Sequence, residues 1–121
     1  MRTQEIKFRG LDCGYSIFVG NKAINLLPQK IKNTCPNTKK IALIVDSKIP
    51  KKFIKTIKIK LRKYELLFLS FSANEKNKSL KSINFFLNKI LEKNFNRSDL
   101  VIAVGGGITG DVAGFVSSIF K

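Results

Sequence analysis

The sequence contains no histidine and no tryptophan, and only 8 of its 121 residues are acidic. The lack of histidine removes the commonest metal ligand and the commonest general base, so we expect no zinc site built by this chain alone. Hydrophobic residues make up 44% of the sequence, which is enough for a packed core and argues against disorder. At this length we expect a single domain.

Cysteine is also scarce. Cys13 and Cys35 are too far apart for a CxxC motif, and the first residues do not read as a signal peptide. We therefore expect two free thiols, which is typical of a protein in a reducing cytoplasm.

The shortage of acids leaves a formal net charge of +15. Such a charge attracts nucleic acid or phosphorylated small molecules, but it also arises when lysine is simply abundant on solvent-facing surfaces. The lysines of "KKFIKTIKIKLRK" follow the second pattern and do not alternate with aromatic residues. We therefore expect no nucleic-acid partner.

One apolar stretch, from Leu100 to Phe120, is long enough to span a membrane. Asp111 would then lie near the bilayer centre, at a cost of about 2.5–3.5 kcal/mol, and the glycines would weaken the helix. We therefore expect no membrane span.

The order of apolar patterns predicts the fold class. Residues 3–10 and 15–20 read as paired strands, and short apolar runs at 41–46, 65–72 and 99–104 read as buried strands. Apolar residues at helical spacing predict helices over 21–33, 47–64, 77–95 and 107–120. Strand–helix alternation of this kind predicts an α/β fold, a Rossmann-like parallel sheet with flanking helices behind an N-terminal β-hairpin.

The helix boundaries and inward faces follow from the same patterns. We expect Asn21 to cap the first helix, Pro28 to interrupt or kink it, and Pro50 to lie in the first turn of the second. The expected inward-facing residues are Ile24, Leu27 and Ile31 in the first helix, Phe53, Ile54, Ile57 and Leu61 in the second, and Leu80, Ile83, Leu87, Ile90 and Leu91 in the third.

Three consecutive glycines, Gly105 to Gly107, end the last apolar run. Parallel α/β sheets bind ligands at this edge, and glycine lets a phosphate approach the N–H groups at the start of the next helix. The spacing alone leaves a second interpretation open: a tight turn in which Gly110 and Gly114 permit close packing of helix on sheet.

Three segments, in order, resemble the 3-dehydroquinate synthase family. "GGGITGDVAGF" (105–115) is similar to its GGG-x-x-GD-x-x-GF signature, "ANEKNKSL" (73–80) to its DGE-x-x-K-S segment, and "IVDS" (44–47) to a strand end that contacts NAD. Ala73 and Asn74 replace the usual Asp-Gly, and Lys48 stands where a small polar residue is common. The resemblance implies that residues 1–121 form only the N-terminal NAD-binding domain, an incomplete sheet without the family's C-terminal metal and substrate domain.

The resemblance implies an NAD site. Asp46 would hydrogen-bond a ribose hydroxyl, Glu75 and Lys78 would contact the sugar and phosphate region, and Asp111, in the first turn of its helix, would lie by the nicotinamide. From the residues alone, Asp46 is as well explained as a turn acid, and Glu75 with Lys78 as an exposed pair. The expected cofactor-binding residues are Asp46, Asn74, Glu75, Lys78, Gly106, Gly107, Ile108, Thr109, Gly110 and Asp111.

The resemblance also implies a reaction. Family members use NAD to oxidise a hydroxyl of a seven-carbon keto-sugar acid phosphate transiently, so that phosphate can leave and the ring can reclose as 3-dehydroquinate, an intermediate of aromatic amino-acid biosynthesis. A zinc or cobalt ion is held by a Glu and two His of the helical C-terminal domain. We therefore expect no catalytic and no metal-ligating residue in this chain and no activity from it alone. The expected partners are a phosphorylated substrate and either a separate C-terminal half or a second copy.

Other assignments stay open at this stage. Related sugar-phosphate cyclases share these motifs, and iron-containing alcohol and glycerol dehydrogenases share the domain and the glycine run, although the GD-x-x-GF and E-x-x-K-S patterns favour a cyclase. The chain could also be a nucleotide-binding fragment without catalysis, which NAD affinity without turnover would reveal.

Overall fold

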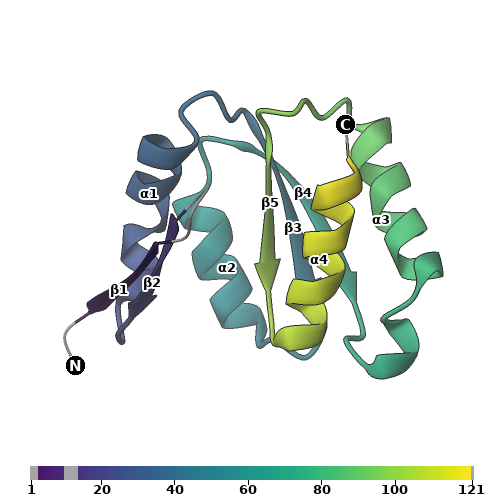
Figure 1. Cartoon of the computed structure of the whole chain (residues 1–121), viewed down its shortest axis with the longest axis horizontal. Coiled ribbons are helices and arrows are strands. Elements are labelled where there is room, and N and C mark those ends of the chain that lie inside the picture. The colour runs from purple at the N-terminus through teal and green to yellow at the C-terminus, as the bar shows by residue number, and fades with distance from the viewer. Residues whose placement is uncertain (1–2, 10–13, 121) are drawn as a thin grey trace.

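The structure, a computed structural model, describes residues 3–9 and 14–120 (Figure 1). Its elements are β1 (Gln4–Arg9), β2 (Gly14–Val19), η1 (Ala23–Leu26), α1 (Leu27–Thr34), β3 (Lys40–Asp46), α2 (Lys51–Lys60), β4 (Glu65–Phe71), η2 (Glu75–Asn77), α3 (Leu80–Glu92), β5 (Leu100–Val104) and α4 (Gly107–Ile119). Strands β3, β4 and β5 form a parallel sheet in the order β4–β3–β5, while β1 and β2 pair antiparallel as a separate ribbon. The predicted class, a parallel α/β sheet with an N-terminal hairpin, is confirmed.

The sheet lies between two layers of helices (Figure 1). Ala42 and Ile44 of β3 pack with α3 and α4 on one face, whereas Ile41, Leu43 and Val45 pack with α1 and α2 on the other. The central strand is therefore buried on both faces, which explains why its sequence is a continuous apolar run. The hairpin lies beside α1, where the Lys30 ammonium sits 4.9 Å from the centre of the Phe18 ring.

The two outer strands are less buried than their apolar sequences predict. Within the described residues β4 and β5 each pair only with β3, so each is an edge strand. Ala103 of β5 is exposed and the other residues of that strand are only partly buried. The strand predicted over residues 99–104 is present as β5, but its predicted burial is wrong, because a continuous apolar run does not by itself reveal how many neighbours a strand has.

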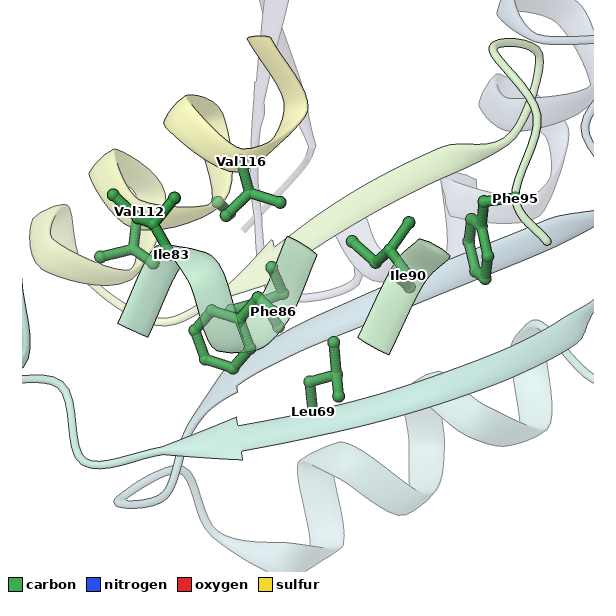
Figure 2. Packing of buried hydrophobic residues seen from close by; sticks show 10 residues of the cluster. Leu69, Ile83, Phe86, Ile90, Phe95, Val112 and Val116 are labelled. Carbon is green, nitrogen blue, oxygen red and sulfur yellow. The ribbon is translucent and has the colours of Figure 1, made fainter. Parts of the chain in front are cut away.

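Phe86 is the centre of the core on the α3–α4 face. Its side chain is 1% exposed and makes an edge contact with Phe71 at 5.2 Å between ring centres. Figure 2 shows it among side chains that converge from the sheet and both helices, and the labelled residues around it are Leu69, Ile83, Ile90, Phe95, Val112 and Val116. The predicted stripe of α3 was partly wrong, because Leu80 and Leu91 are 73% and 45% exposed. The face of α3 that packs against the sheet is centred on Phe86, and Leu80 and Leu91 lie outside that face.

The helix starts also differ from the sequence prediction. Lys22, not Asn21, precedes the first 3₁₀ turn, and no side chain caps it. Pro28 does not break α1, because it lies in the first turn, where its missing N–H has no helical partner to lose. Pro50 lies directly before α2 with φ −57° and ψ 139°. Phe53 is 52% exposed, contrary to its predicted inward position.

Among the residues that the structure describes, Cys35 is a free, partly buried thiol, and Cys13 lies outside the described residues. In the described ranges, no helix is both long enough and apolar enough to cross a membrane. The apolar stretch from Leu100 to Phe120 contains strand β5 and helix α4.

Asp99 ties together the amino ends of β3 and β5. Its Oδ1 accepts hydrogen bonds from the N–H groups of Lys39 and Lys40 at 3.1 and 3.0 Å, and its Oδ2 accepts one from Asn96 at 2.8 Å. Desolvation by partial burial acts to raise the pKa of the Asp99 carboxyl, but the three N–H donors and the Lys40 ammonium outweigh it and lower that pKa below its ordinary value of 3.8.

We expect Asp99→Asn to reduce the free energy of unfolding at neutral pH by about 1–2 kcal/mol, because an amide NH₂ would face one of the three N–H donors. A lowered folded pKa means that the stabilisation is present above the unfolded pKa and is lost as pH falls through the folded value. Urea unfolding at neutral pH and near pH 3 should therefore show the difference between wild type and variant shrinking in acid. Glu92→Gln, at an exposed carboxylate, is the control. If the difference in the free energy of unfolding between wild type and Asp99→Asn were as large near pH 3 as at neutral pH, the stabilisation would not come from the charge of the Asp99 carboxylate.

Candidate functional site

The carboxyl ends of β3 and β5 meet at one edge of the sheet. Parallel pairing sets Val45 beside Val104, so Asp46 and Gly105, the next residues along each strand, also become neighbours. A Cβ atom built on Gly105 would lie 3.1 Å from the Cβ of Asp46. Two segments that are far apart in the sequence, both expected to contact NAD, thus lie together at one edge of the sheet.

Gly105 has a backbone conformation that explains the first glycine of the triplet. Its φ is +154°, and an added Cβ would lie 2.5 Å from Oγ1 and 2.9 Å from Cβ of Thr109. Both the conformation and the lack of space exclude a larger side chain. This glycine is required by the fold itself.

The glycines that follow Gly105 in this turn and in α4 have no such requirement. A Cβ atom at Gly106, Gly107, Gly110 or Gly114 would meet nothing within 4 Å. The interpretation that Gly110 and Gly114 permit close packing of α4 on the sheet is therefore wrong. Gly106 lies in the N-cap position of α4 without a side-chain cap, and Gly107 is its first residue. The start of this thirteen-residue helix is an open cradle of backbone N–H groups, which favours an anion.

Thr109 adds a buried polar atom directly under this cradle. The residue is 0% exposed, and in the described part of the chain its Oγ1 has no hydrogen-bond partner. A buried hydroxyl without a partner costs about 1–3 kcal/mol of stability. An unsatisfied group beside a glycine turn marks a position where stability is traded for another property.

We expect Thr109→Val to raise the free energy of unfolding by about 1 kcal/mol, because valine has the shape of threonine without the unpaired oxygen. Urea denaturation measures the change. Thr56→Val is a matched control, because that hydroxyl is exposed and donates to the Lys52 carbonyl at 3.0 Å. Loss of stability in Thr109→Val would show that the buried hydroxyl is satisfied.

Lys78 and Asp111 meet at the mouth of a cleft between α3 and α4. Lys78 Nζ lies 2.9 Å from Asp111 Oδ2, and both side chains are largely exposed. The hydrogen bond to Asp111, the charge of Asp111 and the charge of Glu75 together raise the pKa of the Lys78 ammonium above its ordinary value. The cleft, of about 380 Å³, has Leu80 and Phe115 among its lining residues. The leucine that the helical pattern placed in the core thus lines this cleft instead.

Asp111 lies farther along its helix than predicted. It is the fifth residue of α4 and not part of the first turn, which contains no acidic residue. The positive end of the helix is therefore not neutralised by its own side chains. Asp111 is instead oriented by Lys78, thirty-three residues earlier in the sequence, a pairing that the predicted contact of Lys78 with Glu75 did not include.

The remaining predicted residues make local contacts. Asp46 Oδ1 accepts a hydrogen bond from the Lys48 N–H at 3.1 Å, so it also serves as the turn acid considered from sequence. Asn74 precedes η2 and accepts from the Asn77 N–H at 2.9 Å, while Glu75 is exposed in η2. Ile108 is partly buried in the core. These contacts neither test nor oppose a role in binding a cofactor.

In the described ranges no group of three or more His, Cys, Asp or Glu side chains could hold a metal ion. The site consists of backbone N–H groups, one buried hydroxyl and an exposed ion pair. Such a donor set suits the phosphates and sugar hydroxyls of a nucleotide.

Comparisons with known proteins agree with this description. A family model described as "3-dehydroquinate synthase N-terminal" matches residues 68–121. The 3-dehydroquinate synthase of Pelagibacter ubique is 41% identical over 107 residues, a match that covers 88% of this chain and 29% of that protein. The same enzyme of Streptococcus thermophilus is 32% identical over 108 residues, and this match covers 88% of this chain and 30% of that protein. The chain therefore spans less than a third of the length of either relative.

Solved structures match over nearly the whole chain. A crystal structure of 2-deoxy-scyllo-inosose synthase superposes with a TM-score of 0.81 at 23% identity, covering 98% of this chain and 33% of that one. A second structure of that enzyme, complexed with carbaglucose-6-phosphate, NAD⁺ and Co²⁺, gives a TM-score of 0.78 at 21% identity.

The chain thus has the α/β fold found in 2-deoxy-scyllo-inosose synthase, with the glycine turn at the carboxyl edge of its parallel sheet, the edge at which open α/β sheets generally bind ligands. By sequence it is similar to the N-terminal part of 3-dehydroquinate synthases.

Proposed function

We propose that this chain binds NAD at the carboxyl edge of β3 and β5, as the cofactor-binding part of a 3-dehydroquinate synthase. One observation carries the proposal. Gly106, Gly107 and Gly110 are not needed by the described chain, because a side chain at each would meet only empty space. Glycines that the fold does not require, at an uncapped helix N-terminus, fit the close approach of a diphosphate.

The surrounding residues fit the rest of a dinucleotide. Asp46, at the end of β3, would accept hydrogen bonds from a ribose, as acids at strand ends do in dinucleotide folds. Lys78 offers a positive charge, and Asp111 a carboxylate that Lys78 holds in place. Asn74 and Glu75 lie just before Lys78 on η2 and would complete the polar wall. NAD would supply hydride transfer, and these residues would bind and orient it.

For the complete enzyme we propose cyclisation of a seven-carbon keto-sugar acid phosphate with loss of phosphate. The similarity to 3-dehydroquinate synthases and the likeness to a structure that holds carbaglucose-6-phosphate, NAD⁺ and Co²⁺ support this assignment. This sequence has no histidine, so the ligands of a metal such as zinc or cobalt would come from the C-terminal region that the relatives possess. We propose that the chain alone binds NAD without turnover, and that its setting is the cytoplasm.

Calorimetric titration with NAD tests the binding proposal. We expect Gly107→Ala to weaken NAD binding about tenfold or more, since its methyl group would stand where the diphosphate approaches. Gly114→Ala is the matched control, because it makes the same change in the same helix and also meets empty space. Both variants should fold at least as well as wild type, since alanine favours helix by up to about 1 kcal/mol. Equal NAD affinities in the two variants would remove the glycine turn from the site.

Activity is tested separately. The chain would be assayed for phosphate release and 3-dehydroquinate formation with substrate, NAD and a divalent metal, alone and together with the C-terminal region of the Pelagibacter ubique enzyme. Turnover only in the mixture supports the proposed division of roles. NAD binding without turnover in either case would favour a nucleotide-binding protein without catalysis.

A further inference from the structure

A second concave surface lies between α2 and β4, and only its Asp46 end adjoins the glycine turn. We call it the α2–β4 groove; it has a volume of about 660 Å³ and is lined by both charged and apolar side chains. Ile54, Ile59 and Phe68 form its apolar surface, and Ile59 and Phe68 are 51% and 41% exposed. Large apolar side chains at this exposure in a concave surface favour contact with a ligand or partner.

Four cations line the same groove along one stripe of α2 and the turn after it. Lys51, Lys55, Lys58 and Arg62 are spaced by four, three and four residues, which places them on one side of the helix. Lys58 Nζ lies 4.1 Å from the centre of the Phe68 ring. In the described part of the chain none of the four has a carboxylate partner within ion-pair distance. The single acid of the groove, Asp46, lies at the end nearest the glycine turn.

This arrangement is unfavourable in the free chain. Like charges at i and i+4 destabilise a helix, and the exposed apolar surface of the groove is in contact with water. A ligand with carboxylates beside apolar groups would relieve both costs. Because Lys51 and Arg62 are eleven positions apart, or about 16 Å at helical rise, the complementary ligand is long and not compact.

The neighbouring strand indicates the form of such a ligand. Strand β4 pairs with β3 on one side, and its other edge has no strand partner among the described residues. An open edge binds an extended peptide through main-chain hydrogen bonds, with alternate side chains on one face. About five residues of extended chain span the length of the cation stripe.

We propose that the α2–β4 groove binds an acidic, extended peptide segment of a partner protein, which adds to the edge of β4. Glutamates at alternate positions lay their methylenes on Phe68 and Ile59 and set their carboxylates against Lys55 and Lys58. A nucleic acid is the less suitable occupant, because its phosphates would leave the apolar surface uncovered and cannot pair with a strand edge. The site shares only Asp46 with the proposed NAD site and does not depend on it.

A synthetic peptide tests the proposal on the complete 121-residue chain. The probe is a fluorescein-labelled Thr-Glu-Thr-Val-Thr-Glu-Thr, whose groove-facing positions are Glu, Val and Glu, and binding is followed by anisotropy at low salt. The double variant Lys55→Glu/Lys58→Glu reverses two exposed charges of the groove. Lys32→Glu/Lys81→Glu is the matched control, because it changes the net charge equally at exposed positions outside the groove.

We expect saturable binding that weakens about tenfold in the groove variant and less than about twofold in the control. Replacing the second Thr of the peptide by Pro should abolish binding, since strand addition needs that N–H. Hydrogen exchange should show protection of β4 amides when the peptide is bound. Equal weakening in both double variants, equal affinity of the proline peptide, or full displacement of the peptide by oligothymidylate would overturn the proposal, the last in favour of general polyanion binding.

Discussion

Phe86→Ala is expected to lower the free energy of unfolding by about 3–5 kcal/mol, the largest effect of any single change proposed for this chain. Phe86 is 1% exposed, and its ring contacts Phe71 and Phe85 at centre distances of 5.2 and 5.7 Å. Truncation would remove these contacts and leave a cavity between α3 and the sheet, at the position that Figure 2 shows. Since small domains are stable by about 5–15 kcal/mol, this loss would remove a large fraction of the total stability.

The neighbouring residue provides a control for this experiment. Phe85 is 51% exposed, although its ring touches that of Phe86. Phe85→Ala removes the same number of atoms from a solvated position, and we expect a loss of only about 1 kcal/mol or less. Urea unfolding and near-UV circular dichroism of both variants would measure the difference. Equal losses would mean that α3 packs on the sheet with a different face.

Gly105→Ala is expected to destabilise the chain by about 2–5 kcal/mol, because two costs add. Alanine rarely adopts a φ of +154°, and its methyl would lie 2.5 Å from Thr109 Oγ1. The backbone must then shift at the junction of β5 and α4, where the proposed diphosphate cradle begins. We expect NAD affinity to fall together with stability in this variant.

Gly106→Ala is the control, because it adds a methyl group to the same turn without either of these two costs. Its Cβ meets nothing within 4 Å and its φ of −91° suits alanine, so stability should change by less than about 1 kcal/mol. Thermal and urea unfolding of the two variants would be compared directly. A Gly105→Ala variant as stable as Gly106→Ala would show that the turn relaxes without cost.

Much of the fold could be predicted from the sequence, because local apolar patterns and backbone preferences determine it. The central strand, Lys40–Asp46, was predicted within one residue because burial on both faces demands a continuous apolar run. The glycine triplet predicted the turn after β5, since few other residues accept such backbone geometry. The start of α3 was placed too early. Ser79 caps it by accepting from the Ser82 N–H, and a separate 3₁₀ turn precedes it.

The role of individual charges was less predictable. The pairing of Lys78 with Asp111 depends on how α3 and α4 pack together, and the three hydrogen bonds to Asp99 depend on strand alignment. The cations of the α2–β4 groove were read from sequence as a solvated face. Only the position of α2 beside the edge of β4 sets them around an apolar groove. The sequence pattern does not distinguish a long charged side chain that lies in water from one that pairs with another charge or lines a groove.

The sequence by itself determined the resemblance to 3-dehydroquinate synthases, the α/β class, the order of the strands and helices along the chain, and the identity of the glycine turn. Each of these depends on residues close together in the chain, where periodicity and backbone sterics act directly. Only the tertiary structure decided which strand is central, that Phe86 and not Leu80 is buried, that Thr109 has no hydrogen-bond partner among the described residues, and which glycines the fold requires. These properties arise from contacts between distant segments, and such contacts form only when the sheet and its two helical layers pack together.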